Sequence, residues 1–182
     1  LIVKSAVMGL ALVLAILLLT LRFTVAVWVT VGIAISFVGA FIFLPMVDVS
    51  INFLSLFAFL LVLGIVVDDA IVVGESIHHH REELGFDAEE AAIAGASAVA
   101  RPVVFAVLTT VVAFVPWAFL SGPQSEFLRH LSAVIAFALM FSLIEAFFIL
   151  PAHLRKLSTR DSGNKGFAAQ RYISDAISGF SK

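Results

Sequence analysis

Two adjacent carboxylates inside an apolar stretch constrain this chain more than any other feature. Asp68 and Asp69 lie within Leu63–Ser76 (LGIVVDDAIVVGES), a segment of mostly apolar residues. An aspartate near the centre of a membrane helix costs about 2.5 to 3.5 kcal/mol on insertion, so the pair costs on the order of 6 kcal/mol if both face lipid. Ionisable groups at that depth indicate a functional site.

The composition predicts that the chain folds in a lipid bilayer. It is 62% hydrophobic, has a mean hydropathy of +1.12 and is only 13% charged, whereas a soluble domain is about 25% charged. It has no cysteine, which excludes disulfides and cysteine-ligated metals. We therefore predict an all-α fold, a polytopic membrane helix bundle.

Five segments are long enough to span a membrane, which takes about 20 mostly apolar residues. In the third segment, the apolar residues outweigh the two aspartates at about −0.3 to −0.6 kcal/mol each. We expect Pro45 and Pro151 to end the second and fifth spans, and Pro116 to kink the fourth, because proline lacks the backbone N–H. The predicted spans are residues 1–21, 25–44, 53–77, 102–120 and 127–150.

Two further helices are predicted on the membrane surface. Asp87, followed by Glu90, has the spacing of a helix N-cap with a capping-box partner, and a short amphipathic helix should run from there to Arg101, before the fourth span begins at Pro102. Residues 166–182 place apolar side chains on one helical face and polar ones opposite, which is typical of a helix lying on a membrane; an unstructured tail is the alternative. The predicted domains are a transmembrane bundle at 1–157, a linker at 158–165 and a cytoplasmic surface helix at 166–182.

Small residues mark places where helices could approach closely. A stripe of small residues runs along the second span: Gly32, Ser36, Gly39 and Ala40. Such stripes favour helix packing in membranes; chance composition facing lipid is the alternative. Gly64 precedes Asp68 by one turn and leaves room there for a neighbouring helix or water.

The basic residues predict an orientation. With loops assigned alternately to the two sides, every Lys and Arg except Lys4 and Arg129 falls on one side. The positive-inside rule then places the C-terminus in the cytoplasm and the N-terminus outside. Because the chain begins without Met in an apolar run and has no signal sequence, we expect at least one more span upstream.

The aspartate pair suits a proton carrier. Adjacent helical residues point about 100° apart, so both side chains can face the bundle interior, and they would titrate as a coupled pair. One state can be neutral and buried, the other charged and paired. The alternative is a purely structural pair held by a cation from another helix, but no span here has a basic residue at comparable depth.

The stretch GIVVDDAIVVGE resembles the fourth transmembrane helix of the resistance-nodulation-cell division (RND) superfamily of proton-driven efflux transporters, especially the hydrophobe/amphiphile efflux type. Further stretches match that family in order along the chain. The first span with LRFTVAVWVTVGIAI resembles the second and third helices, and DVSINFLSLF the external link. FVPWAFLSG resembles the end of the fifth helix, and LIEAFFILPAHL the sixth.

This resemblance implies a function. Asp68 and Asp69 would bind protons, and Lys, Arg and Thr from the other half of the same polypeptide would complete the relay. The resemblance also implies a drug/proton antiporter rather than an enzyme, powered by the proton motive force without a cofactor. It would lie in the bacterial inner membrane as a homotrimer with a periplasmic adaptor and an outer-membrane channel, and bind no nucleic acid. Ser76 stands where many relatives carry Asn.

Other functions stay open. One is a non-efflux relative, such as a lipid, sterol-sensing or protein-export membrane domain. Another is an intramembrane aspartyl protease, which would need its two acids on different helices to flank one water.

Several polar residues are secondary candidates for the relay. Glu75 could pass protons toward the cytoplasm or simply reach water at the span end. Glu145, one turn after Ser142, is either a second buried acid or part of a wet helix interface. Thr109 and Thr110 could donate to the aspartates, although membrane threonines more often bond their own helix.

Three consecutive histidines, His78 to His80, suggest a metal site at first sight. Consecutive helical positions fan out over about 200° and cannot converge on one ion, unlike an i, i+4 pair. We expect a solvated segment at the membrane edge and no metal.

Overall fold

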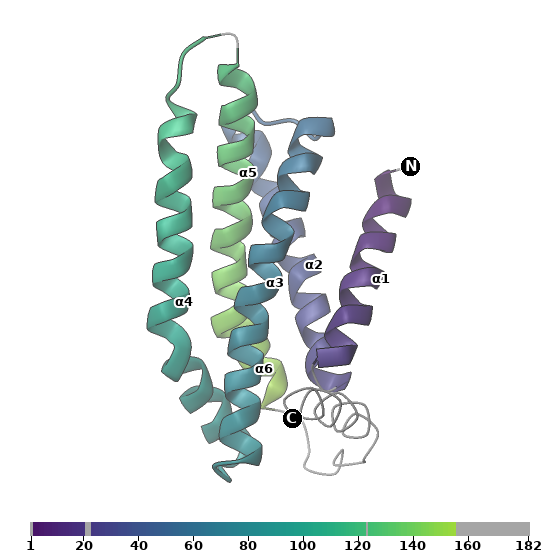
Figure 1. Cartoon of the computed structure of the whole chain (residues 1–182), viewed down its shortest axis with the longest axis vertical. Helices are drawn as coiled ribbons and strands as arrows, with labels where there is room; N and C mark the ends of the chain where they lie inside the picture. The colour runs from purple at the N-terminus through teal and green to yellow at the C-terminus, as the bar shows by residue number, and fades with distance from the viewer. Residues whose placement is uncertain (1, 21–22, 123, 156–182) are drawn as a thin grey trace, which may run out of the picture.

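The computed structural model describes residues 2–20, 23–122 and 124–155, and these ranges contain helices and connecting turns but no strand. Figure 1 shows α2 to α5 running up and down beside one another, while α1 leans outward from its contact with α2. The predicted all-α fold is confirmed, and the predicted linker and surface helix at 158–182 lie outside the described residues. The α-helices are α1 (Ile2–Thr20), α2 (Phe23–Phe43), α3 (Phe53–Glu82), α4 (Ala88–Ala118), α5 (Ser125–Ile144) and α6 (Leu150–Leu154), with a 3-10 turn η1 (Leu44–Val47) and a π turn η2 (Glu145–Ile149).

Four segments of the described chain are long and apolar enough to cross a membrane. They overlap the second to fifth predicted spans, although the segment that holds the fourth begins 14 residues earlier than predicted. The helix α1, at 19 residues, is not among them, so the first span stays a prediction. The four segments are Val25–Val47, Phe53–Glu82, Ala88–Ala118 and Ser125–Leu154.

Side-chain caps begin α3 and α4. Oδ1 of Asn52 accepts hydrogen bonds from two first-turn amides of α3, both at 2.9 Å, and Oγ of Ser55 accepts from the backbone N–H of Asn52 at 2.8 Å. In the same way, Asp87 accepts from two amides of α4 at 2.8 and 2.9 Å. The predicted Asp87 cap is confirmed, but its predicted capping-box partner Glu90 returns no side-chain hydrogen bond to it. The Asn52 capping box, which was not predicted, sets where the aspartate-bearing helix begins.

The helix α4 is continuous, and the prediction of a separate surface helix ending at Arg101 is wrong. Pro102 lies inside α4, where a proline removes one hydrogen bond and bends a helix without necessarily ending it. Figure 1 shows α4 changing direction toward the foot of α3. Oγ of Ser76 donates to the carbonyl of Gly95 at 2.8 Å, and a Cβ on Gly95 would lie 2.5 Å from Cα of Ile77. This close contact makes the first part of α4 a member of the bundle.

The last helix does not end at Pro151, contrary to the prediction. The chain passes from α5 through the π turn at Glu145–Ile149 into α6, which contains Pro151 and reaches Leu154. A proline ring clashes with the carbonyl four residues earlier in a regular α-helix. The wider π turn immediately before Pro151 changes that register, so the helix continues.

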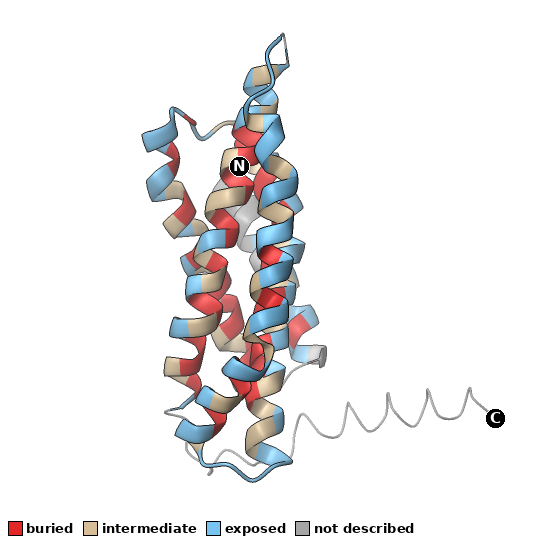
Figure 2. Ribbon diagram, turned by 90° about the vertical axis from the view of Figure 1, so that its left-hand side faces the viewer, coloured by how far each residue is buried: buried red, intermediate tan, exposed pale blue. Residues whose placement is uncertain are grey.

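Burial follows one stripe along α3. Figure 2 shows buried residues on the inward faces of the helices and exposed ones outside. The outer surface is itself apolar, with Phe53 86% and Phe105 67% exposed, as expected for helices surrounded by lipid. The buried positions of α3 recur every three or four residues and include Val62, Val66, Asp69 and Val73. This period puts one carboxylate into the core.

Candidate functional site

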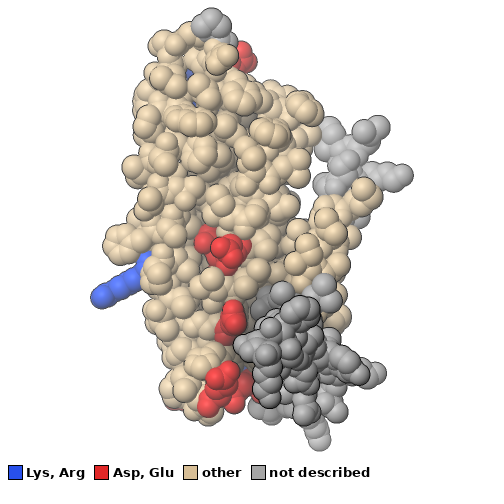
Figure 3. Space-filling view, viewed as in Figure 1, with Lys and Arg blue, Asp and Glu red and all other residues tan. Residues whose placement is uncertain are grey.

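The two aspartates lie on different sides of α3. Asp69 belongs to the inward stripe and is 7% exposed, whereas Asp68 is exposed. The rotation of about 100° between neighbouring helical residues accounts for the separation. Figure 3 shows acidic side chains at the surface over α3, midway along the bundle and toward its lower end. The described helices therefore enclose one carboxylate and leave the other open.

The Asp69 carboxylate is buried without a full set of partners. Its Oδ2 accepts no hydrogen bond within the described chain. The fully buried Ser142 of α5 brings its hydroxyl close enough to interact with this carboxylate, but the two do not meet the geometry of a standard hydrogen bond. An unpaired buried carboxylate is costly when charged, so proton binding or movement of a partner would change the energy of this site.

A second acid lies in the same core. Glu145 is 1% exposed, and neither of its carboxylate oxygens has a hydrogen-bond partner among the described residues. Its side chain lies against Gly32 of α2: a Cβ there would collide with the Glu145 carboxylate and lie 2.6 Å from its Cγ. Of the two interpretations left open by the sequence, the structure favours the buried acid over the wet interface.

The small-residue stripe of α2 faces α5. A Cβ on Gly39 would lie 2.5 Å from Cδ1 of Phe141, so Gly32 and Gly39 both admit side chains from the last helical segment. Gly64 is different, because a Cβ there would meet nothing within 4 Å in the described chain. The room beside Gly64 lies on the exposed side of α3.

The remaining relay candidates do not join the buried acids. The hydroxyls of Thr109 and Thr110 donate to carbonyls four residues back in α4, at 2.7 and 3.0 Å, as membrane threonines commonly do. Glu75 is exposed on α3.

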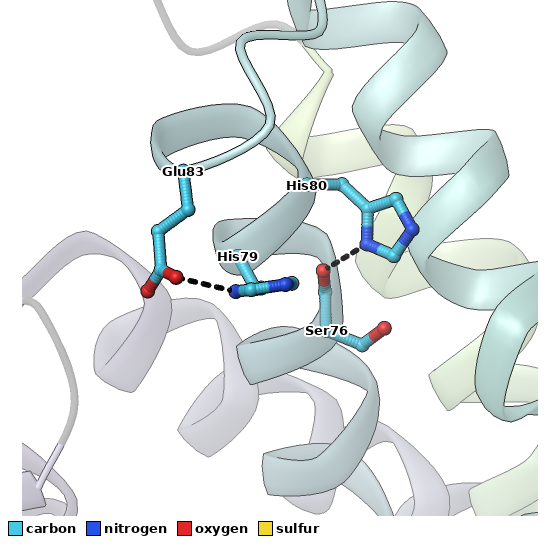
Figure 4. Close-up of polar contacts among 4 residues, drawn as sticks. All are labelled: Ser76, His79, His80 and Glu83. Carbon is cyan, nitrogen blue, oxygen red and sulfur yellow. Dashed lines mark hydrogen bonds and ion pairs between the residues drawn. The ribbon is translucent and has the colours of Figure 1, made fainter.

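Two of the three histidines at the foot of α3, His79 and His80, point in different directions (Figure 4). Nδ1 of His79 lies 3.0 Å from Oε2 of Glu83, and Nδ1 of His80 lies 2.8 Å from the carbonyl oxygen of Ser76. In the part of the chain that the structure describes, no three His, Asp or Glu side chains are grouped as a metal site would require.

Two contacts that position α3 and Glu145 were not predicted from the sequence. One joins Ser76 to the Gly95 carbonyl, and the other places Glu145 on Gly32. The small-residue run AAIAGASA in α4 is a signal for close helix packing. Nothing in the sequence pairs Glu145 with α2.

Long apolar helices around buried carboxylates define a multi-pass membrane protein, and comparison with known proteins supplies its family. Residues 1–172 match the model of the AcrB/AcrD/AcrF family. The chain is 32% identical over 149 residues to multidrug resistance protein MdtC of Salmonella schwarzengrund, and 30% identical over 141 residues to multidrug export protein AcrF of Escherichia coli K12. It is also 30% identical over 123 residues to multidrug resistance protein MdtF of the same strain.

The chain therefore belongs to the AcrB/AcrD/AcrF family of RND efflux transporters, which are transporters and not enzymes. The three alignments cover 81%, 75% and 68% of this chain but only 14%, 14% and 12% of MdtC, AcrF and MdtF. Most of the length of each relative thus lies outside the matched stretch.

Proposed function

We propose that this chain forms part of the membrane domain of a drug/proton antiporter, in which Asp68 and Asp69 bind and release the driving protons. The observation that carries the proposal is the buried carboxylate of Asp69 in α3. One of its oxygens has no hydrogen-bond partner among the described residues. Membership of an efflux family supports the transport class.

The two carboxylates would have different roles in proton binding. Protonated Asp69 is neutral and tolerates the core, whereas its carboxylate requires a cation or hydrogen-bond donor. Asp68, on the open side of α3, is the residue that a Lys, Arg or Thr from another part of the transporter can reach. Each proton moving inward through 100 mV supplies about 2.3 kcal/mol. Proton uptake and release would thereby change how α3 packs against the rest of the transporter.

The membrane location, orientation and partners of the protein follow from the same proposal. The chain would lie in the bacterial inner membrane with its C-terminus in the cytoplasm and its first residue on the periplasmic side. It would need no cofactor besides the proton motive force. The other half of the polypeptide would cover the Asp68 side of α3, and a homotrimer would work with a periplasmic adaptor and an outer-membrane channel.

The arrangement of the acids disfavours an intramembrane aspartyl protease formed by this pair. Such an enzyme needs two carboxylates that flank one water, and Asp68 and Asp69 point to different sides of one helix. A non-efflux superfamily member would have the same helices, so transport assays must separate it from a drug exporter.

The proposal is tested in the full-length transporter with Asp68→Asn and Asp69→Asn. Each change removes a proton-binding carboxylate with little change in shape, and we expect drug export to be abolished while the protein remains folded and inserted. Drug resistance of cells and drug-dependent proton flux in vesicles are the measurements, with exposed Glu126→Gln on α5 as the control. Resistance retained by both aspartate variants would contradict the proposal.

A further inference from the structure

We propose that Glu145 is a second proton-binding residue, buried in the same core as Asp69. This inference rests on the proposed proton coupling and extends it from α3 to the last helix of the bundle. It assigns the last helix a part in proton movement as well as in packing.

The first step is the charge state of Glu145. The side chain is 1% exposed, and both its oxygens lack hydrogen-bond partners within the described ranges. A charged carboxylate in that environment would lose its hydration without gaining a hydrogen bond or an ion pair, so the neutral acid is the stable form there. In this conformation Glu145 therefore holds a proton.

The second step is the set of ionisable groups around it. The helix α2, which contacts η2, carries no titratable residue. On α3 the inward acid is Asp69, with Asp68 outward; on α4, Arg101 and the first-turn acids are exposed. His153 of α6 packs on Trp28, with ring centroids 4.0 Å apart. On α5, His130 is buried near the start of the helix, far along it from Glu145. Within the described helices, the other buried acid of the core is thus Asp69.

The third step is the polar content of the core between α3 and the last helical segment. Ser142 precedes Glu145 by three residues on one helical face, and its hydroxyl is fully buried without a hydrogen-bond partner in the described chain. No described hydrogen bond therefore offsets the charge that Glu145 gains when it releases its proton.

The fourth step is the backbone at this point. The π turn begins at Glu145, and its side chain lies on the bare backbone of Gly32. Single π turns inside α-helices are frequent at functional sites. Gain or loss of the proton on Glu145 would change the contact with α2 at the residue where the π turn begins.

The test compares Glu145→Gln and Glu145→Asp in the full-length transporter. Gln retains the shape over Gly32 but cannot release a proton, so we expect proton-coupled drug transport in vesicles to fall at least about tenfold, as on loss of an acid–base group. Asp retains an ionisable group and should keep part of the activity. Glu126→Gln, at the exposed start of α5, is the matched control. Parental transport by Glu145→Gln would overturn the inference.

A second measurement does not depend on transport. Infrared difference spectra between acidic and alkaline pH should contain the carbonyl band of a buried carboxylic acid that is lost in purified Glu145→Gln. An unchanged band would overturn the inference. If Asp68→Asn and Asp69→Asn transport normally, the proposed function fails; if they are inactive and Glu145→Gln is fully active, only the role of Glu145 fails.

Discussion

Asp69 and Asp68 are neighbours in sequence but occupy opposite environments. Asp69 faces α5 in the core together with the inward stripe of α3, whereas Asp68 shares the outer side of that helix with Gly64 and Glu75. The inner side is closed by contacts within this chain, and the outer side meets none of the described helices at Gly64. The described helices thus complete the surroundings of Asp69 and leave Asp68 exposed.

The largest expected effect concerns the inner acid. Asp69→Asn should abolish proton-coupled transport, a loss of about a hundredfold or more, because the amide cannot bind and release the proton. The thermal stability of the protein in detergent should stay equal or rise, because the buried carboxylate makes few compensating interactions. Flux assays and thermal unfolding of the same preparation check both points, and a sharp fall in stability would instead indicate a structural role.

A large loss of stability is expected at the α3–α4 contact. Gly95→Ala would place a Cβ 2.5 Å from Cα of Ile77, and backbone cannot move aside as a side chain can. We expect destabilisation by about 3 kcal/mol, the upper part of the usual range for overpacking, measured by unfolding in mixed detergent. Ala96→Ser, a small change at the next position, serves as the comparison, and equal stability of the two variants would argue against close packing here.

A smaller loss is expected where Glu145 meets α2. The Gly32→Ala methyl group would collide with the Glu145 side chain, which can partly move away, so the cost should be about 1 to 2 kcal/mol. Shortening the acid in Gly32→Ala/Glu145→Ala should recover part of that loss. A double-mutant cycle measures the coupling, and strict additivity would mean that the two residues do not touch.

The smallest effect is expected on the outer side of α3. Nothing lies within 4 Å of a Cβ at Gly64, so Gly64→Ala should stabilise the isolated chain by about 0.5 to 1 kcal/mol through helix propensity. The same change in the full-length transporter should instead reduce stability or transport if a partner helix packs there. Identical gains in both proteins would show that this side faces lipid.

Much of the fold could be predicted from local sequence. Hydropathy placed four apolar helices, because each such helix inserts on its own composition, and Asp87 marked the start of α4 because a cap needs only its own first turn. The helix boundaries predicted at Pro102 and Pro151 were wrong, because both residues lie inside helical segments. Contacts of α4 with α3 accommodate Pro102, and the π turn accommodates Pro151. The effect of a proline depends on these neighbours, which local sequence does not specify.

Composition and the positions of Asp68 and Asp69 along the chain are enough to predict two acids deep in a membrane helix. Helix packing then encloses Asp69, leaves Asp68 open and brings Glu145 into the same core. Apolar residues surround the aspartates on all faces of α3, so hydropathy cannot tell the inner side of this helix from its outer side. Packing against α4 and α5 makes that choice.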